Sequence, residues 1–106
     1  MTLYHVTRAR SLRSILATGL KVMGSHEGRP VVWLCDGEHL LWTLNHVAQW
    51  KRRAPSSMRI LSVECDPGTF TRVRPGTYVS RSDIPPGRLE CSASQASLAL
   101  DPRTLG

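Results

Sequence analysis

The sequence is poor in acidic and in aromatic residues. Eight Asp and Glu stand against 14 Lys and Arg, which leaves a formal charge of +6, and aromatic residues make up 6% of the chain. This excess of positive charge favours an anionic partner, such as nucleic acid, a nucleotide or an acidic protein surface. The sequence also lacks any apolar run near the roughly 20 residues that a membrane-spanning helix needs. We therefore expect no membrane segment.

Cysteine is scarce and has no recognisable pattern. Cys35, Cys65 and Cys91 form no CxxC pair and no other metal-ligand spacing. An odd number of unpatterned cysteines is typical of reduced thiols rather than of a disulfide framework. The N-terminus also lacks a basic segment followed by an apolar one, so no signal peptide is expected. These features predict a cytoplasmic protein.

The length of 106 residues fits one domain, which we expect to span residues 1–106. Two helices are predicted early and most strands late, which is typical of an α+β fold rather than of a parallel sheet. The tail from Ser92 contains a further helix-like stretch. The predicted helices cover about 11–19 and 36–53, and the predicted strands cover 2–6, 31–35, 58–65, 69–73, 77–81 and 88–90.

Both helices are predicted from apolar stripes at helical spacing. Ser11 and Gly19 suit the start and the end of the first, and Asp36 suits the N-cap of the second. The basic run 51–53 follows the second helix, where cations complement the helix dipole, and Pro55 ends it. The stripes are Leu12, Ile15, Leu16 and Leu20, and Leu40, Leu41, Leu44, Val47 and Ala48.

Several short segments occur in an order that resembles the ADP-ribosyltransferase superfamily. The match extends over roughly residues 3–90, and the segment from Gly76 to Leu89 is similar to the end of the RNA 2′-phosphotransferase branch. Each segment alone is weakly specific, and their order and spacing carry the resemblance. The segments are YHVT, IL-x-x-GL, VVWLCD, ILSVECDPGTF and PGTYVSRSDIPPGRL.

The resemblance implies a split β-sheet core with two helices that binds NAD. It further implies transfer of ADP-ribose to a nucleic-acid or protein acceptor, with NAD as co-substrate. We expect the core alone, because the N-terminal lobe of the RNA 2′-phosphotransferases, with its Arg-His pair, has no counterpart here. The poly-ADP-ribosylating branch is the other similar branch.

The resemblance also implies where NAD would bind. His5 would bond the ribose next to nicotinamide, and the backbone of Thr7 would meet the nicotinamide amide. Trp33 and Tyr78 would form the aromatic walls of the pocket. Each residue has a structural alternative: a core histidine bonded to backbone for His5, a helix cap for Thr7, and sheet packing for both aromatic residues.

Basic residues after the first and last long strands are candidate phosphate ligands. Arg8, Arg10 and Arg13 suit the pyrophosphate of NAD through bidentate bonds, or else a solvated helix face. Arg81 suits a phosphate or the acceptor. His26, in the predicted loop of residues 21–30, lies either over the ligand or in solvent.

The catalytic set implied by the resemblance is His5, Tyr78 and Thr77. Aligning the late strand on Tyr78 places Thr77 where the poly-ADP-ribosylating branch has a glutamate. Thr77 carries no negative charge but can hydrogen-bond a ribose hydroxyl. Glu64 and Glu90 are remote candidates for the missing acid.

Other readings remain open from the sequence. His39 and His46 lie seven residues apart on the second predicted helix, a spacing that rarely forms a metal site, so no metal is expected. The fold is also compatible with a catalytically inactive basic module that binds nucleic acid or a partner protein. A compact toxin-like effector is a third possibility. The sequence shows no alternation of aromatic and basic residues of the kind that stacks single strands.

Overall fold

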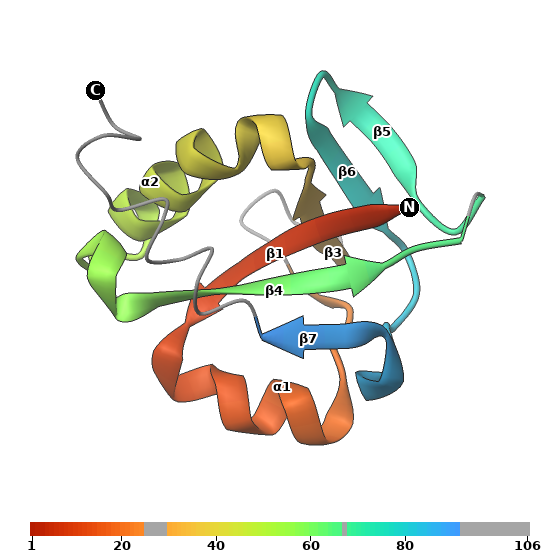
Figure 1. Cartoon of the computed structure of the whole chain (residues 1–106), viewed down its shortest axis with the longest axis horizontal. Helices are drawn as coiled ribbons and strands as arrows, with labels where there is room; N and C mark the ends of the chain where they lie inside the picture. Colours follow the sequence, from red (N-terminus) through yellow and green to blue (C-terminus); the bar gives the residue numbers. More distant parts are fainter. Residues whose placement is uncertain (25–29, 67, 92–106) are drawn as a thin grey trace.

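The computed structural model describes residues 1–24, 30–66 and 68–91. It is a small α+β domain whose strands form one antiparallel sheet in the order β5-β6-β3-β1-β4-β7, with β2 paired to β3 (Figure 1). The helices are α1 (Leu12–Thr18) and α2 (Leu40–Trp50). The strands are β1 (Thr2–Arg8), β2 (Met23–Gly24), β3 (Pro30–Cys35), β4 (Met58–Glu64), β5 (Thr71–Arg74), β6 (Thr77–Ser80) and β7 (Leu89–Cys91).

Each helix covers a different face of the sheet. Alternate residues of a strand point to opposite faces, and β4 shows this directly: Ile60 and Leu61 are both fully buried but belong to separate apolar clusters. The Ile60 cluster packs under α2 through Leu44 and Ala48. The Leu61 cluster packs against α1 (Figure 1). Two small cores therefore hold the sheet between the helices.

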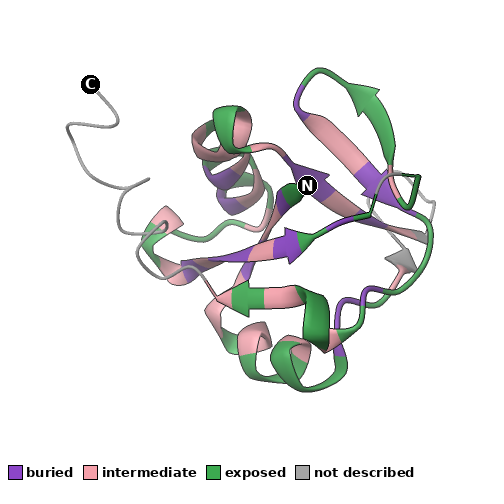
Figure 2. Cartoon of the chain, turned by 45° about the vertical axis from the view of Figure 1, so that its right-hand side comes forward, coloured by how far each residue is buried: buried purple, intermediate pink, exposed green. Residues whose placement is uncertain are grey.

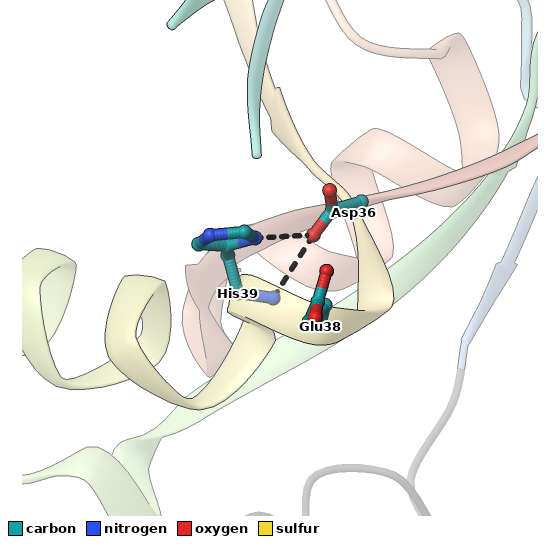
Figure 3. Close-up of side chains that lie close together, drawn as sticks. All are labelled: Asp36, Glu38 and His39. Carbon is teal, nitrogen blue, oxygen red and sulfur yellow. Dashed lines mark hydrogen bonds and ion pairs between the residues drawn. The ribbon is translucent and has the colours of Figure 1, made fainter. Parts of the chain in front are cut away.

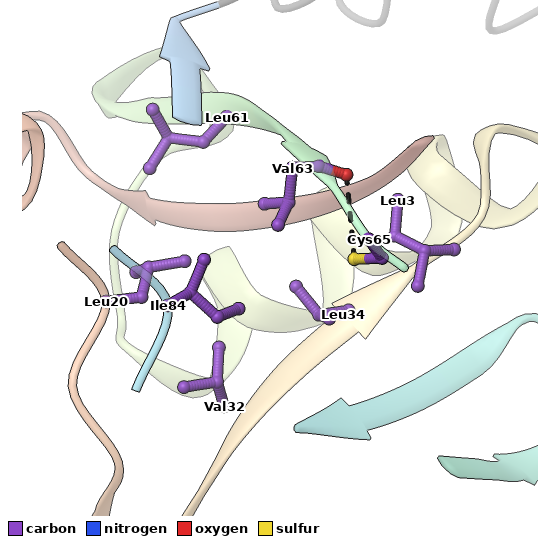
Figure 4. Packing of buried hydrophobic residues seen from close by; sticks show 8 residues of the cluster. All are labelled: Leu3, Leu20, Val32, Leu34, Leu61, Val63, Cys65 and Ile84. Atoms are coloured by element: carbon purple, nitrogen blue, oxygen red, sulfur yellow. Dashed lines mark hydrogen bonds between the residues drawn. The ribbon is translucent and has the colours of Figure 1, made fainter. Parts of the chain in front are cut away.

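The cluster on the α1 side is the larger one and joins residues distant in the sequence. Leu20 and Ile84 are buried in it and exchange two backbone hydrogen bonds of 2.8 Å. Figure 2 shows that burial concentrates in the central strands, while much of each helix is exposed. The buried members of this cluster are drawn in Figure 4: Leu3, Leu20, Val32, Leu34, Leu61, Val63, Cys65 and Ile84.

The predicted elements are largely confirmed, with local corrections. In the predicted stripe of the first helix, Leu16 is 39% exposed and Leu20 lies beyond the end of α1. Because α1 has only seven residues, its buried side is narrower than that stripe. The strand predicted over 69–73 begins at Thr71 and is exposed throughout. The helix-like stretch after Ser92 lies outside the described residues. Among the helices that the structure describes, none has the length and apolar content to cross a bilayer.

Gly19 ends α1 in a conformation that other residues rarely adopt. Its φ is +89°, and a Cβ there would lie 2.2 Å from the carbonyl oxygen of Ile84. Gly19→Ala should therefore lower the free energy of unfolding by more than about 1 kcal/mol, because it adds a left-handed strain and disrupts the Leu20–Ile84 bridge. Urea denaturation measures the loss. The control is Gly87→Ala, where a Cβ meets nothing within 4 Å; equal losses in both variants would contradict the interpretation.

Candidate functional site

The pairing of β1 changes at Tyr4. Strand β1 pairs with β4 from Thr2 to Arg8, but with β3 only between Tyr4 and Cys35. His5 is the next residue, and its ring Nδ1 lies 2.8 Å from the carbonyl oxygen of Trp33 on β3. A side chain thus bonds the β3 backbone just beyond the last paired position. This places a histidine ring between two strands rather than above them.

The hydrogen bond decides which nitrogen of His5 carries the proton. A carbonyl oxygen only accepts, so Nδ1 donates and Nε2 of the neutral ring holds a lone pair. Burial lowers the pKa of His5 below its ordinary value; the bond to Trp33 raises it, and the charge of Lys51 lowers it further. His5 is therefore neutral at pH 7, and Nε2 is an acceptor suited to a hydroxyl group.

His5 opens onto a cavity of about 100 Å³ beneath α2. The stacked rings of Trp42 and His46, one helical turn apart on α2, form part of its wall, with centroids 4.7 Å apart and planes within 10°. Such a volume is below the roughly 300–1,000 Å³ of pockets that enclose a drug-sized ligand. It suits one ring of a larger molecule. Further lining residues are Trp33 and Leu34 of β3, Thr43 of α2, Arg74 of β5 and Thr77 of β6.

Cationic side chains occur in and near this cavity. Arg74 lines it. Lys51, at the end of α2, lies close enough to His5 to affect its pKa. The pKa of Lys51 is itself lowered, first by burial and then by the charge of Arg8. Each of two neighbouring cations destabilises the positive charge of the other, and together they create a positive potential that stabilises an anion.

The structure brings together some predicted site residues and separates others. His5, Trp33 and Thr77 line one cavity. Tyr78 follows Thr77 on β6, so it points to the other face, where its ring meets Phe70 edge to face at 5.5 Å. Thr77 and Tyr78 therefore cannot both form walls of the same pocket. Because successive side chains of a strand point to opposite faces, the sequence alone already excluded this pair as two walls of one pocket.

The other predicted ligands are placed less favourably for this cavity. Arg8 ends β1 close to Lys51. Thr7 is 7% exposed, whereas Arg13 on α1 and Arg81 after β6 are exposed, and none of these three lines the cavity. His26 lies outside the described residues.

The two candidates for the missing acid, Glu64 and Glu90, also lie outside the His5 cavity. Glu64 is exposed and bonds the hydroxyl of Thr2. Its second oxygen lies 3.8 Å from the N-terminal amine. Glu90 is exposed on β7. Neither carboxylate lines the His5 cavity.

A larger cavity of about 190 Å³ lies on the α1 side, between the end of β4 and the segment after β6. Its carboxylates already have partners. Asp66 forms a two-pronged bond with Arg88, at 3.1 and 2.8 Å, and Asp83 accepts from the amide of Val22 at 2.8 Å. Lys21 also pairs with Asp83. These ion pairs join surface segments, and we favour the smaller cavity as the site because it contains His5.

A third group of polar side chains stands at the start of α2 (Figure 3). The ligand atoms of Asp36, Glu38 and His39 lie within 4.8 Å of one another. Asp36 Oδ1 accepts from the backbone amide of His39 at 2.9 Å and lies 2.7 Å from its ring Nδ1. These contacts confirm Asp36 as an N-cap, here of the 3₁₀ turn Gly37–His39 that leads into α2. His39 thus precedes α2 and does not share a helix face with His46.

Trp42, Thr43, His46 and Arg74 were not singled out as site residues from the sequence. The sequence does contain a signal for two of these residues, Trp42 and His46. Trp42 and His46 are aromatic residues four apart on a helix that follows the Trp33 strand, outside its apolar stripe. Residues four apart stack on one helix face. No sequence pattern indicates Arg74, since only the pairing of β5 with β6 brings it beside Thr77.

Comparisons with known proteins leave the family of this chain open. The sequence matches no family model, and it matches no curated protein.

The stability of the domain should depend on pH through His5. In the unfolded chain His5 titrates near its ordinary pKa of 6.5, but in the folded protein its pKa is lower. Between these two values the unfolded state binds more protons, so the free energy of unfolding should fall as the pH drops below about 6.5. Urea denaturation from pH 7.5 to 5.5 measures the trend. In His5→Gln the decline should be smaller, and an identical decline would exclude His5 as its source.

Asp36→Ala should destabilise the start of α2. Loss of the cap is expected to cost about 1 kcal/mol at pH 7. Burial raises the pKa of Asp36, but its hydrogen bonds with His39 outweigh this and lower it. The carboxylate's contribution is therefore present above the ordinary pKa and lost as the pH falls through the lower folded value. Glu38→Ala, which removes an exposed neighbouring carboxylate, is the control in urea denaturation. A similar loss in both variants would contradict the capping role.

Proposed function

We propose that this protein binds NAD in the cavity beside His5 and transfers ADP-ribose to an acceptor. One observation carries the proposal: His5, Trp33 and Thr77, which come from three separate strands, line one cavity. The family resemblance supplies the choice of NAD.

The polar groups of the cavity suit a ribose. The lone pair on Nε2 of His5 accepts from a ribose hydroxyl, since Nδ1 is engaged with Trp33. The hydroxyl of Thr77 donates to, or accepts from, a second ribose oxygen. The strands β3 and β6 hold Trp33 and Thr77 on the same face, because Trp33 pairs with Val79 and Thr77 stands two residues before it.

The aromatic groups suit the nicotinamide ring. Trp33, Trp42 and His46 supply flat surfaces, and aromatic rings stack in offset or edge-to-face arrangements. Because the cavity has room for one ring, the nicotinamide would occupy it, its ribose would reach His5 and Thr77 at the opening, and the remainder of the dinucleotide would lie on the surface. Arg74, Lys51 and Arg8 are the nearby cations for its pyrophosphate.

In the transfer, the bond between the ribose carbon and the nicotinamide nitrogen breaks, nicotinamide leaves with the electron pair, and an acceptor nucleophile bonds that carbon and releases its proton. The residues of this chain position the ribose and the ring for that exchange. Thr77 provides no negative charge for the positive ribose of the transition state. We therefore expect slow turnover.

Isothermal titration with NAD tests the binding. We expect binding by the wild type and at least a tenfold loss of affinity in Thr77→Val, because one hydrogen bond within a cavity is lost. Thr71→Val is the matched control: Thr71 is exposed on the neighbouring strand β5. NAD affinity should also weaken below the folded pKa of His5, where Nε2 carries a proton and no longer accepts.

Release of nicotinamide, followed by mass spectrometry with mixed nucleic-acid and protein acceptors, tests the transfer. Absence of NAD binding by the folded wild-type protein would overturn the proposal. Binding without any nicotinamide release would reduce it to a module that holds NAD. Equal NAD affinities in Thr77→Val and Thr71→Val would remove Thr77 from the site.

A further inference from the structure

One side of α2 carries exposed aromatic residues. Trp42 is 56% exposed and Trp50 is 54% exposed, and His46 between them is exposed as well. The three residues follow one another at intervals of four, so they lie along one side of the helix. Tryptophan is highly buried on average. Two of the three tryptophans of this chain are nevertheless exposed, and they lie on the same helix face. We call Trp42, His46 and Trp50 the α2 ridge.

The ridge joins the His5 cavity to the basic end of the helix. Trp42 and His46 line the cavity, whereas Trp50 precedes the run Lys51-Arg52-Arg53. The ammonium group of Lys51 lies 4.9 Å from the centre of the Trp50 ring. Arg52 and Arg53 are exposed. Rings and cations therefore occur together at one end of the ridge, and rings and the cavity at the other.

We propose that the α2 ridge binds a single-stranded nucleic acid, whose bases stack on its rings while its phosphates contact the cations after Trp50. Every base has a flat face, and aromatic side chains with neighbouring positive charge are the usual elements of single-strand binding. The net charge of +6 agrees with a polyanion. Because the three rings are exposed, a strand binds to them without disturbing the apolar core.

The accessibility of base faces favours a single strand over a duplex. Trp42 and His46 already stack on each other, with ring centroids 4.7 Å apart. A base therefore stacks on the outer side of this pair or on Trp50, and not between the two rings. The bases of a duplex are stacked on one another, whereas an unpaired strand has base faces free to stack on aromatic side chains.

The ridge also suggests which acceptor serves the proposed transfer, and this second step rests on the proposed function. A strand lying on Trp50 leads along α2 towards the cavity that contains His5. The nucleotide nearest the cavity would then be the one presented for modification. Binding to the ridge is independent of NAD and is measured without it.

Fluorescence anisotropy with a labelled oligothymidine of 12 nucleotides tests the binding, and an equimolar duplex of the same length is the comparison. We expect tighter binding of the single strand, weakening with salt, and quenching of tryptophan fluorescence by stacked bases. Trp50→Ala should weaken binding about tenfold, the scale of one lost stacking contact, and Trp50→Phe should restore most of it. Because Trp50 is exposed, both variants should keep the fold, and thermal unfolding checks this.

The two lysines provide a matched test of charge. Lys51→Gln and Lys21→Gln each remove one positive charge, but only Lys51 stands beside the ridge, while Lys21 pairs with Asp83 on the α1 side. We expect weaker oligonucleotide binding in Lys51→Gln alone. Equal losses in the two variants, unchanged binding in Trp50→Ala, equal affinity for the duplex, or binding to vesicles of anionic lipid but not to oligothymidine would each overturn the proposal.

The outcomes separate this inference from the proposed function. Oligothymidine binding without NAD binding would leave the ridge standing and overturn the transferase. NAD binding without oligothymidine binding would leave the transferase and overturn the ridge. If both bind, nicotinamide release that rises on adding oligothymidine supports the acceptor role, and no rise contradicts it.

Discussion

The hydrogen bond between His5 and the carbonyl oxygen of Trp33 is the contact on which the candidate site depends. It occupies the position just past the single paired residue of β1 and β3. By engaging Nδ1 it leaves the lone pair of Nε2 as the acceptor, and burial keeps the ring neutral. Without this bond the ring would have no defined tautomer or orientation. The chemistry of the cavity therefore follows from one side chain that bridges two strands.

The two-faced sheet explains why the site lies where it does. The α1 side is filled by the larger apolar cluster, and the charged groups over its cavity are paired with each other. The α2 side has the smaller cluster, whose residues come from β1, β4 and α2 and not from β3. There the helix presents Trp42 and His46 instead of aliphatic residues. Because the apolar core on this face is small, it does not fill the space beneath α2, and the rings beside that cavity remain exposed.

Most elements were predictable because their signals are local. Asp36 was identified as a cap, and the contact with the His39 amide confirms it. The strand of residues 31–35 and the apolar stripe of α2 were read from patterns within a dozen residues. For Tyr78 the alignment of strands was not enough to give the side chain's direction: the pleat of β6 turns it away from Thr77 and toward Phe70. The aromatic residues of α2 were missed because their spacing is helical rather than sequential, whereas the basic run 51–53 was interpreted as a complement of the helix dipole.

The sequence by itself determined the α+β class, the positive charge, the apolar stripes and the candidate residues for a sugar or a phosphate. Each depends on composition or on neighbours within one element. Only the tertiary structure decided that His5, Trp33 and Thr77 share a cavity and that Arg74 joins them. Those contacts follow from which strands pair, and from the point where β1 and β3 stop pairing. Pairing between distant segments is set by the packing of the whole sheet, so no single segment encodes it.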